Sequence, residues 1–300
     1  MLNRLRFSAL RLSAIAAVAG LAALLAGCSS ERGPGELAIR LAPGETMSFT
    51  LAASQDIRQS AGGRNLELAQ ETRTAYRFEV REASPAGRLT VHALYEAITL
   101  SIQSPAGALS WDSRKPDEGT AALRPMGELV GKGFDFVVTR RGEIEDVRGV
   151  ELLAEQIGGG AGNAGGVPSA ALSPGSWLSA ESVASDLASF FCPYPDGPVA
   201  VGESWQTERR DGSGLGLRMT NRWTLARRAG GTATIALASM VSSSGAGSGL
   251  SGTQKGTFMV QLATGRVLSA SIDQAIGGTI DVRGTPVTID IRSRIRISGE

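Results

Sequence analysis

Apolar and polar residues alternate with a period of two along most of this chain, and the last segment shows the pattern most clearly. One parity holds isoleucines and the other holds charged residues: Ile289, Ile291, Ile295 and Ile297, against Asp290, Arg292, Arg294 and Arg296. Such alternation is typical of a β-strand with one buried face and one face in water. The arginine row therefore predicts a solvated face, and its charge also discourages edge-to-edge aggregation.

The same alternation recurs from Thr46 onward, which predicts a mainly β fold of antiparallel strands. Further apolar rows are Met47, Phe49 and Leu51; Tyr76, Phe78 and Val80; Leu89, Val91, Ala93 and Tyr95; Phe134, Phe136 and Val138; and Phe258, Val260 and Leu262. After Tyr95 the apolar set changes parity, to Ile98 and Leu100. A one-residue shift exchanges the two faces of a strand, so we expect a bulge near Glu96 and Ala97.

Two short segments have helical periodicity instead. Their apolar residues are Val150, Leu153, Ala154 and Ile157 in the first, and Val183, Leu187, Phe190 and Phe191 in the second. Each set has the spacing of one apolar helix face. Ser179 is the predicted N-cap of the second helix, and Cys192-Pro193 its predicted stop. Residues 158–175, between the helices, are rich in Gly, Pro and Ser and predict a flexible link.

The strand pattern occurs twice, once on each side of this link. Residues 133–144 parallel residues 256–267, and Tyr76–Val80 before Gly87 parallel Asn221–Leu225 before Gly231. We therefore expect two related antiparallel units of curved sheet. They either face each other as a sandwich or continue as one open barrel.

The first 28 residues carry a targeting signal. Arg4, Arg6 and Arg11 precede an apolar run from Leu12 to Leu25, which ends in the small residues Ala26 and Gly27. This order is typical of a secretory signal peptide. The ending Leu25-Ala26-Gly27-Cys28 resembles the lipobox of bacterial lipoproteins. That resemblance implies cleavage before Cys28, acylation of its thiol and anchoring in a membrane.

Residue 29 is serine rather than aspartate, so the same resemblance implies an outer-membrane location facing the periplasm if the cell is Gram-negative. The predicted organisation follows. It comprises a signal peptide (1–27), a lipidated tether (28–44), a first β unit ending in a short helix (45–157), the link (158–175), and a helix followed by the second β unit (176–300).

Charge and cysteine content limit which binding partners and which disulfides we expect. The chain has 30 basic and 29 acidic residues, and loss of the three leader arginines leaves 27 against 29. No basic excess is present for binding nucleic acid. If Cys28 is acylated, Cys192 has no partner within the chain, so no internal disulfide is expected.

The sequence offers little for catalysis. His92 is the only histidine, and a strand residue is the simpler interpretation. Too few His and Cys residues are present for zinc. The Gly-rich stretch 212–216 lacks the strand and helix that make a phosphate loop. Carboxylates at 143–146 and 116–118 would allow a glycosidase pair, but strand and turn composition explains them more simply. We therefore expect a non-enzymatic protein without cofactor or metal, and a hydrolase has the least support.

The segment from Pro198 to Trp205 resembles a stretch of uncharacterised all-β bacterial lipoproteins, where it marks the entry to the second repeat. Two functions remain open. The protein could bind a lipid or another apolar ligand between its β units, or it could be an interaction module for other envelope proteins. An apolar site would be lined by inward aromatic residues, for which the candidates are Phe49, Phe78, Tyr95, Phe136, Trp223 and Phe258.

Overall fold

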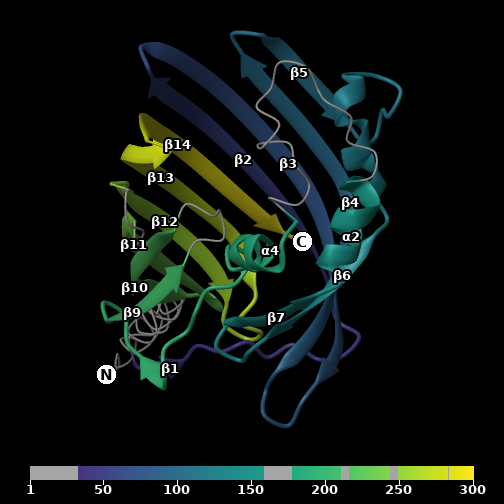
Figure 1. Cartoon of the computed structure of the whole chain (residues 1–300). Helices are drawn as coiled ribbons and strands as arrows, with labels where there is room; N and C mark the ends of the chain where they lie inside the picture. Colours follow the sequence, from purple (N-terminus) through teal and green to yellow (C-terminus); the bar gives the residue numbers. More distant parts are fainter. Residues whose placement is uncertain (1–32, 159–177, 211–215, 244–248, 283) are drawn as a thin grey trace, which may run out of the picture.

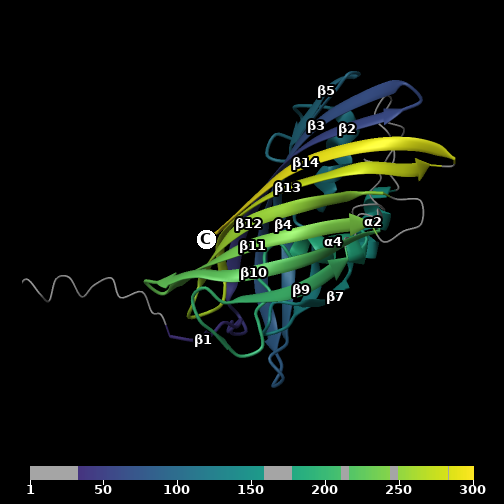
Figure 2. The ribbon, with the colours of Figure 1, turned by 90° about the vertical axis from the view of Figure 1, so that its left-hand side faces the viewer.

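A computed structural model describes residues 33–158, 178–210, 216–243, 249–282 and 284–300 (Figure 1). The predicted signal peptide, Cys28 and all but the first residue of the predicted link lie outside these ranges. The described chain forms one strongly curved antiparallel sheet of twelve strands, a separate two-stranded pair, and short helices. Figure 2 shows the curvature from the side, with α4 within the curve of the sheet. The predicted mainly β class with curved antiparallel sheets is confirmed.

The elements of the first half are β1 (Gly35–Glu36), β2 (Thr46–Ala61), β3 (Arg64–Ala83), β4 (Leu89–Ser104), β5 (Gly107–Asp112), the 3-10 helix η2 (Ala121–Leu129), β6 (Gly133–Val138), β7 (Ile144–Arg148) and α2 (Val150–Gly158). Those of the second half are α4 (Ala180–Leu187), β8 (Pro198–Val199), β9 (Ser204–Arg210), β10 (Leu217–Ala229), β11 (Thr232–Ser243), β12 (Ser251–Gln261), β13 (Val267–Val282) and β14 (Thr285–Gly299).

The two halves continue as one open sheet rather than packing as a sandwich. The strand order is β7-β6-β4-β3-β2-β14-β13-β12-β11-β10-β9, with β5 paired to the far end of β4. The halves join where β2 pairs antiparallel with β14. The sheet ends at β7 on one side and at β9 on the other.

Local geometry confirms that the two units are related. The amide of Gly44 donates to the carbonyl of Val80 at 2.8 Å, and the amide of Gly202 donates to the carbonyl of Leu225 at 2.8 Å. A register shift follows both Val80 and Leu225. An equivalent turn thus precedes the first strand of each unit and is hydrogen-bonded to an equivalent bulge. The sequence repeat therefore corresponds to a structural repeat.

The bulge expected near Glu96 and Ala97 is present. Ala97 pairs with Ala75, whereas Tyr95 pairs with Tyr76, so Glu96 has no partner across the ladder. This extra residue keeps the apolar residues on both sides of it on the concave face, as a β-bulge does.

The two predicted helices are confirmed, with one correction. Ser179 caps α4, because its hydroxyl accepts a hydrogen bond from the amide of Ser182 at 3.1 Å. The helix ends at Leu187, however, and not at Cys192-Pro193. The amide of Phe190 donates to the carbonyl of Leu187 in a turn, which directs Phe190 into the core.

The predicted tether is shorter than residues 28–44. Leu37, Ile39 and Leu41 are buried, and the amide of Ile39 donates to the carbonyl of Arg140 at 2.8 Å. The alternating apolar residues of this segment explain the difference, because they pack under the ends of the sheet like a strand. The Gly- and Pro-rich composition that predicts a tether applies only to the residues before them.

Aromatic side chains fill the core of the first unit on the concave face. Phe78 is fully buried, and its ring centroid lies 5.2 Å from Phe49, 5.4 Å from Phe136 and 5.3 Å from Phe190. All six predicted inward aromatic residues are buried. In the first unit Phe49 and Phe136 pack on Phe78, and Tyr95 packs on Tyr76 and Phe134, whereas Trp223 and Phe258 of the second unit line a cavity.

Candidate functional site

A cavity of about 310 Å³ lies between α4 and the concave face of β9 to β13. Its volume is at the lower end of the range found for small-molecule sites. The walls come from four parts of the chain: the turn and first residue of β7, the helix α4 with the segment after it, β9, and the concave rows of β10 to β13. Figure 1 shows α4 in front of the sheet at this place.

The floor of the cavity is apolar. Trp223, Leu237, Phe258 and Ile272 lie on the inward parity of β10, β11, β12 and β13, and all four are buried. In the register of the sheet, Gly256 stands between Leu237 and Ile272 and adds no side chain. A Cβ at Gly256 would lie 3.2 Å from Cγ1 of Ile272, so the glycine allows Ile272 to pack closely against the backbone of β12.

The roof consists of small residues on one face of α4. Ala184, Ser185 and Ala188 face the floor, and larger side chains at these positions would occupy the space. Arg209 of β9 fixes the helix over the sheet, because its Nη1 donates to the carbonyl of Ser185 at 3.0 Å. The mouth is charged, with Glu143, Glu208 and Arg210 at its rim.

The chain after α4 closes the lower end of the cavity by bridging the two edges of the sheet. Trp205 Nε1 of β9 donates to the carbonyl of Pro193 at 2.8 Å. On the other side, the amide of Tyr194 donates to the carbonyl of Arg141 at 2.8 Å. Trp205 thus holds this bridge and is not among the residues that line the cavity.

Ionisable groups in the core near the cavity stay neutral. Burial raises the pKa of the Tyr76 and Tyr95 phenols well above their usual value, and the proximity of Asp186 contributes in the same direction. Burial also raises the pKa of the Cys192 thiol, which is free and enclosed. These three side chains behind α4 are therefore uncharged at neutral pH.

His92 lies on the opposite face of the sheet from the cavity. Its Nδ1 is 2.7 Å from Oδ1 of Asp135, with which it forms a pair across β4 and β6. The side-chain contacts recorded for the described residues connect this pair to no serine, threonine or cysteine. The structure therefore places His92 as a cross-strand pairing residue on the convex face.

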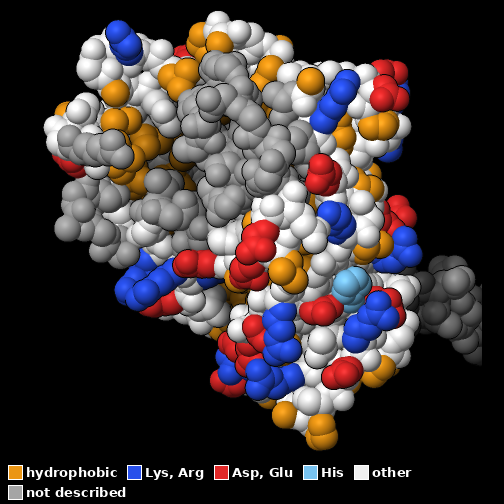
Figure 3. Space-filling view, turned by 45° about the vertical axis from the view of Figure 1, so that its right-hand side comes forward, with side chains coloured by type: hydrophobic (Ala, Val, Ile, Leu, Met, Phe, Trp, Pro, Cys, Tyr) orange, Lys and Arg blue, Asp and Glu red, His pale blue; other side chains and the backbone are white. Residues whose placement is uncertain are grey.

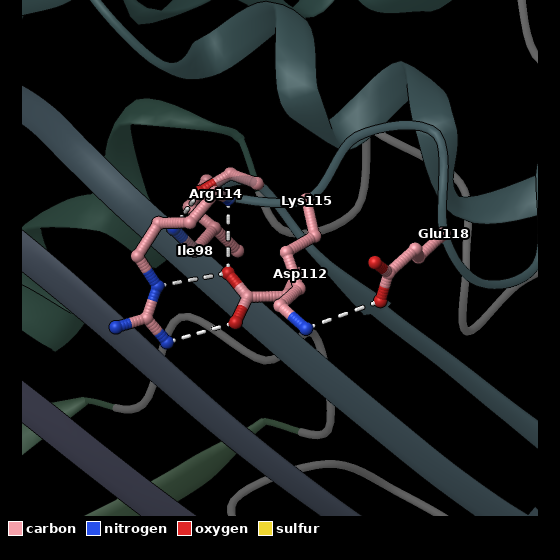
Figure 4. A network of polar contacts seen from close by, with 6 residues as sticks. Ile98, Asp112, Arg114, Lys115 and Glu118 are labelled. Carbon is pink, nitrogen blue, oxygen red and sulfur yellow. Dashed lines mark hydrogen bonds and ion pairs between the residues drawn. The ribbon is translucent and has the colours of Figure 1, made fainter.

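The carboxylates considered for a glycosidase pair are engaged separately. Glu145 pairs with Arg88, and Asp146 pairs with Arg148. In the loop after β5, Lys115 pairs with Glu118 at 3.2 Å (Figure 4). Beside it, hydrogen bonds from Arg114 hold the pKa of Asp112 below its usual value. These contacts stabilise loops and strands. Of the acids considered, only Glu143 lines the cavity, together with Glu181 and Glu208.

Within the described ranges, no group of three or more His, Cys, Asp and Glu side chains is arranged to hold a metal ion. Residues 211–215, most of the Gly-rich stretch considered for phosphate binding, are outside those ranges. None of the described helices is long and apolar enough to cross a membrane.

Sequence reasoning missed the roof and the polar side of this cavity. Ala184 and Ala188 are unremarkable in sequence, and only the placement of α4 makes them part of a site. Thr207, Asn221 and Gln254 line the side of the cavity farthest from the aromatic core. The feature of the sequence that could have revealed them is a polar residue at an inward position in a row of apolar residues.

In Figure 3 hydrophobic side chains gather at the upper left, whereas charged side chains gather toward the lower part.

Comparison with known proteins gives a family and a fold. The model of a family described as "Family of unknown function (DUF6263)" matches residues 86–267. Among curated proteins, none is similar enough in sequence to match this chain.

Among solved structures, a lipovitellin structure that describes lipid–protein interactions has a TM-score of 0.50 at 10% identity over 87% of this chain. The chain spans only 25% of the lipovitellin chain, and at this identity the similarity concerns the fold alone. The translocator domain of the autotransporter NalP from Neisseria meningitidis matches at 8% identity over 93% of this chain and 95% of its own. Its TM-score of 0.22 is too low to support a conclusion.

Proposed function

The chain belongs to the DUF6263 family of unknown function, and we propose that it is a lipid-anchored envelope protein that binds an apolar ligand without catalysis. The observation that supports this proposal is the cavity between α4 and the sheet. Its floor is apolar, its roof is built of small residues, and its charged side chains belong to the rim and to β9, where Arg209 is bonded to the carbonyl of Ser185. A ligand with an acyl chain fits such a site better than a polar substrate.

Two further observations support binding of an apolar ligand. Lipovitellin, whose fold resembles this one, is described by its lipid–protein interactions. His92, the one histidine, is on the convex face and away from the cavity, so the cavity lacks the base that a hydrolase of the serine or cysteine type needs.

The interaction-module alternative has less support. Within the described ranges, the exposed large hydrophobic residues are Leu152, Val201, Met240, Met259 and Val282. They are spread over α2, a loop and three strands. Single exposed apolar residues are normal on soluble surfaces, whereas a docking surface needs a contiguous patch.

Ligand binding is tested by filling the cavity. Ala184→Trp is expected to weaken the binding of a fluorescent fatty acid roughly tenfold, because the indole would occupy the space between roof and floor. The measurement is a fluorescence titration of the soluble form without residues 1–28, together with native mass spectrometry for co-purified lipid. Ala238→Trp, at an exposed position on the convex face of β11, is the matched control. Absence of saturable binding to the unchanged chain, or equal binding by both variants, would contradict the proposal.

The anchor is tested at Cys28. Cells grown with an alkyne-bearing fatty acid are expected to label the unchanged chain and to lose that label in Cys28→Ser, which should also leave the membrane fraction. The reason is that acyl chains contribute about 0.8 kcal/mol of membrane binding per buried CH₂. Cys192→Ser removes the other cysteine and should keep both label and membrane association. A Cys28→Ser chain that stays labelled and membrane-bound would rule out the anchor.

A further inference from the structure

Eight uncharged polar residues form a continuous row across the concave face. Each lies on a different strand, and each is the direct register partner of the next from β9 to β3. The members of this polar belt are Thr207, Asn221, Ser239, Gln254, Gln274, Ser293, Gln55 and Gln70. On β4 and β5 the row continues with the apolar residues Ile102 and Leu109, so the polar part ends there.

Apolar residues flank the belt on both sides. One step toward the aromatic core, the inward positions of β9 to β11 and of β13 and β14 are Trp205, Trp223, Leu237, Ile272 and Ile295. One step away from it, a second hydrophobic cluster begins, which contains Leu217, Met219, Val241, Leu250, Ile276 and Ile289. The belt therefore separates two apolar surfaces on the same face of one sheet.

The belt is not saturated by its own hydrogen bonds. Ser239 Oγ donates to Asn221 Oδ1 at 2.7 Å, and Asn221 Nδ2 donates to Thr207 Oγ1 at 3.5 Å, both at the β9–β11 end. Farther along, Ser293 is 6% exposed, and its hydroxyl has no hydrogen-bond partner. Gln254 is only 7% exposed. A buried polar group without a partner destabilises the folded state, so the Ser293 hydroxyl, in a continuous row of polar side chains, indicates a partner that the chain does not supply.

We propose that the belt recognises the ester carbonyl groups of a neutral lipid of the acylglycerol type, whose acyl chains lie on the apolar surfaces on either side. This inference rests on the proposed function and defines its ligand. Five of the eight belt residues carry a side-chain amide, each with two N–H donors. Carbonyl oxygens are their natural acceptors. The belt itself contains no charged side chain, and Arg209, two residues from Thr207 on β9, is bonded to the carbonyl of Ser185. A carboxylate or phosphate placed at the middle of the belt would therefore lose its hydration without gaining a counter-charge.

The cavity connects to the belt at one end. Thr207, Asn221 and Gln254 belong to both, so a chain that occupies the cavity floor reaches the belt with its polar end. The second hydrophobic cluster begins just beyond them and offers a surface for a second chain. A diacylglycerol has this order of parts, with two apolar chains joined by two esters, whereas a fatty acid or a hydrocarbon lacks the neutral carbonyl groups in the middle.

The test uses the full chain in detergent micelles with three photoactivatable probes that share one acyl chain: a diacylglycerol, the free fatty acid and an alkane. The unchanged chain is expected to be labelled most strongly by the diacylglycerol, with cross-links on peptides of β10, β13 and β14. The variant Gln254→Leu/Gln274→Leu/Ser293→Ala should lose roughly tenfold of this labelling and fall to the level of the alkane. Its labelling by the alkane should not change.

Folding of the variant is checked by its thermal midpoint, which should stay equal or rise, because Ser293→Ala removes an unpartnered buried hydroxyl and the two leucines add apolar surface to a concave face that is apolar on both sides of the belt. The single variant Gln274→Leu, at a half-buried position, gives the same comparison with a smaller change. Gln206→Leu, exposed on the convex face of β9, is the matched control and should keep the diacylglycerol preference. If the belt variant keeps the preference, or the unchanged chain has none, the inference is wrong. If no probe labels the unchanged chain, the proposed function itself fails, and the inference fails with it.

Discussion

Phe78→Ala is expected to lower the free energy of unfolding by about 3–5 kcal/mol, because the residue is a fully buried aromatic side chain at the centre of the core. Its ring contacts four aromatic rings from three other segments: Phe49 of β2, Phe136 of β6, and Phe190 and Phe191 after α4. Removal leaves a cavity that these rigid neighbours cannot fill. The thermal midpoint should fall by roughly 10 °C for a chain of this size.

Met240→Ala is the control for this experiment, since Met240 is 74% exposed on β11. Its effect on urea unfolding should stay within about 0.5 kcal/mol. A small loss for Phe78→Ala would mean that the aromatic core collapses around the substitution, so the packing between the segment after α4 and the sheet would not be as rigid as the ring distances indicate.

Gly265→Ala is expected to destabilise the protein by about 3 kcal/mol through two separate effects. Gly265 has a φ of +71°, which costs an alanine about 1–2 kcal/mol. A Cβ at this position would also lie 2.1 Å from the carbonyl oxygen of Ala38. The segment around Ala38 would have to move, and the hydrogen bond from the amide of Arg40 to the carbonyl of Thr264 would be lost, at about 1 kcal/mol.

Gly230→Ala separates the two effects. Gly230 also has a positive φ, of +59°, but a Cβ there would have no heavy atom within 4 Å. It should cost about 1 kcal/mol, measured by urea unfolding. Equal losses of unfolding free energy for the two variants would show that the contact between the segment around Ala38 and the turn at Gly265 does not contribute to stability.

Much of the fold was predictable because alternation is a local property of the chain. The strands, the two helices, the Ser179 cap and the bulge at Glu96 each depend on a few consecutive residues. The repeat was predictable for the same reason. The end of α4 was predicted wrongly, since Phe190 and Phe191 fit a helical spacing and only their packing in the core shows that the chain turns before them.

The candidate site was not predictable in this way, because it depends on register across many strands. Ser293 interrupts an otherwise complete row of isoleucines in the last strand, and this interruption is visible in sequence. It acquires meaning only when Gln274 and Gln55 are found beside it on the two neighbouring strands. The cavity likewise depends on where α4 rests, which no periodicity determines.

The direction of the strands explains why this molecule has an opening. The row of strands from β7 to β9 contains eleven strands, with both edge strands counted. Ten antiparallel pairings join them, so the two edge strands run in the same direction. They cannot pair with each other in an antiparallel ladder, and one additional strand of opposite direction would be needed between them. The second unit has such a strand in β14, which follows β13, whereas in the first unit the chain leaves β7 to form α2. An even count would have allowed the two edge strands to pair in an antiparallel ladder. Because the count is odd, β7 and β9 stay unpaired with each other, and α4 lies over the opening between them. The helix belongs to no strand ladder, so displacing it would leave every pairing of the sheet intact.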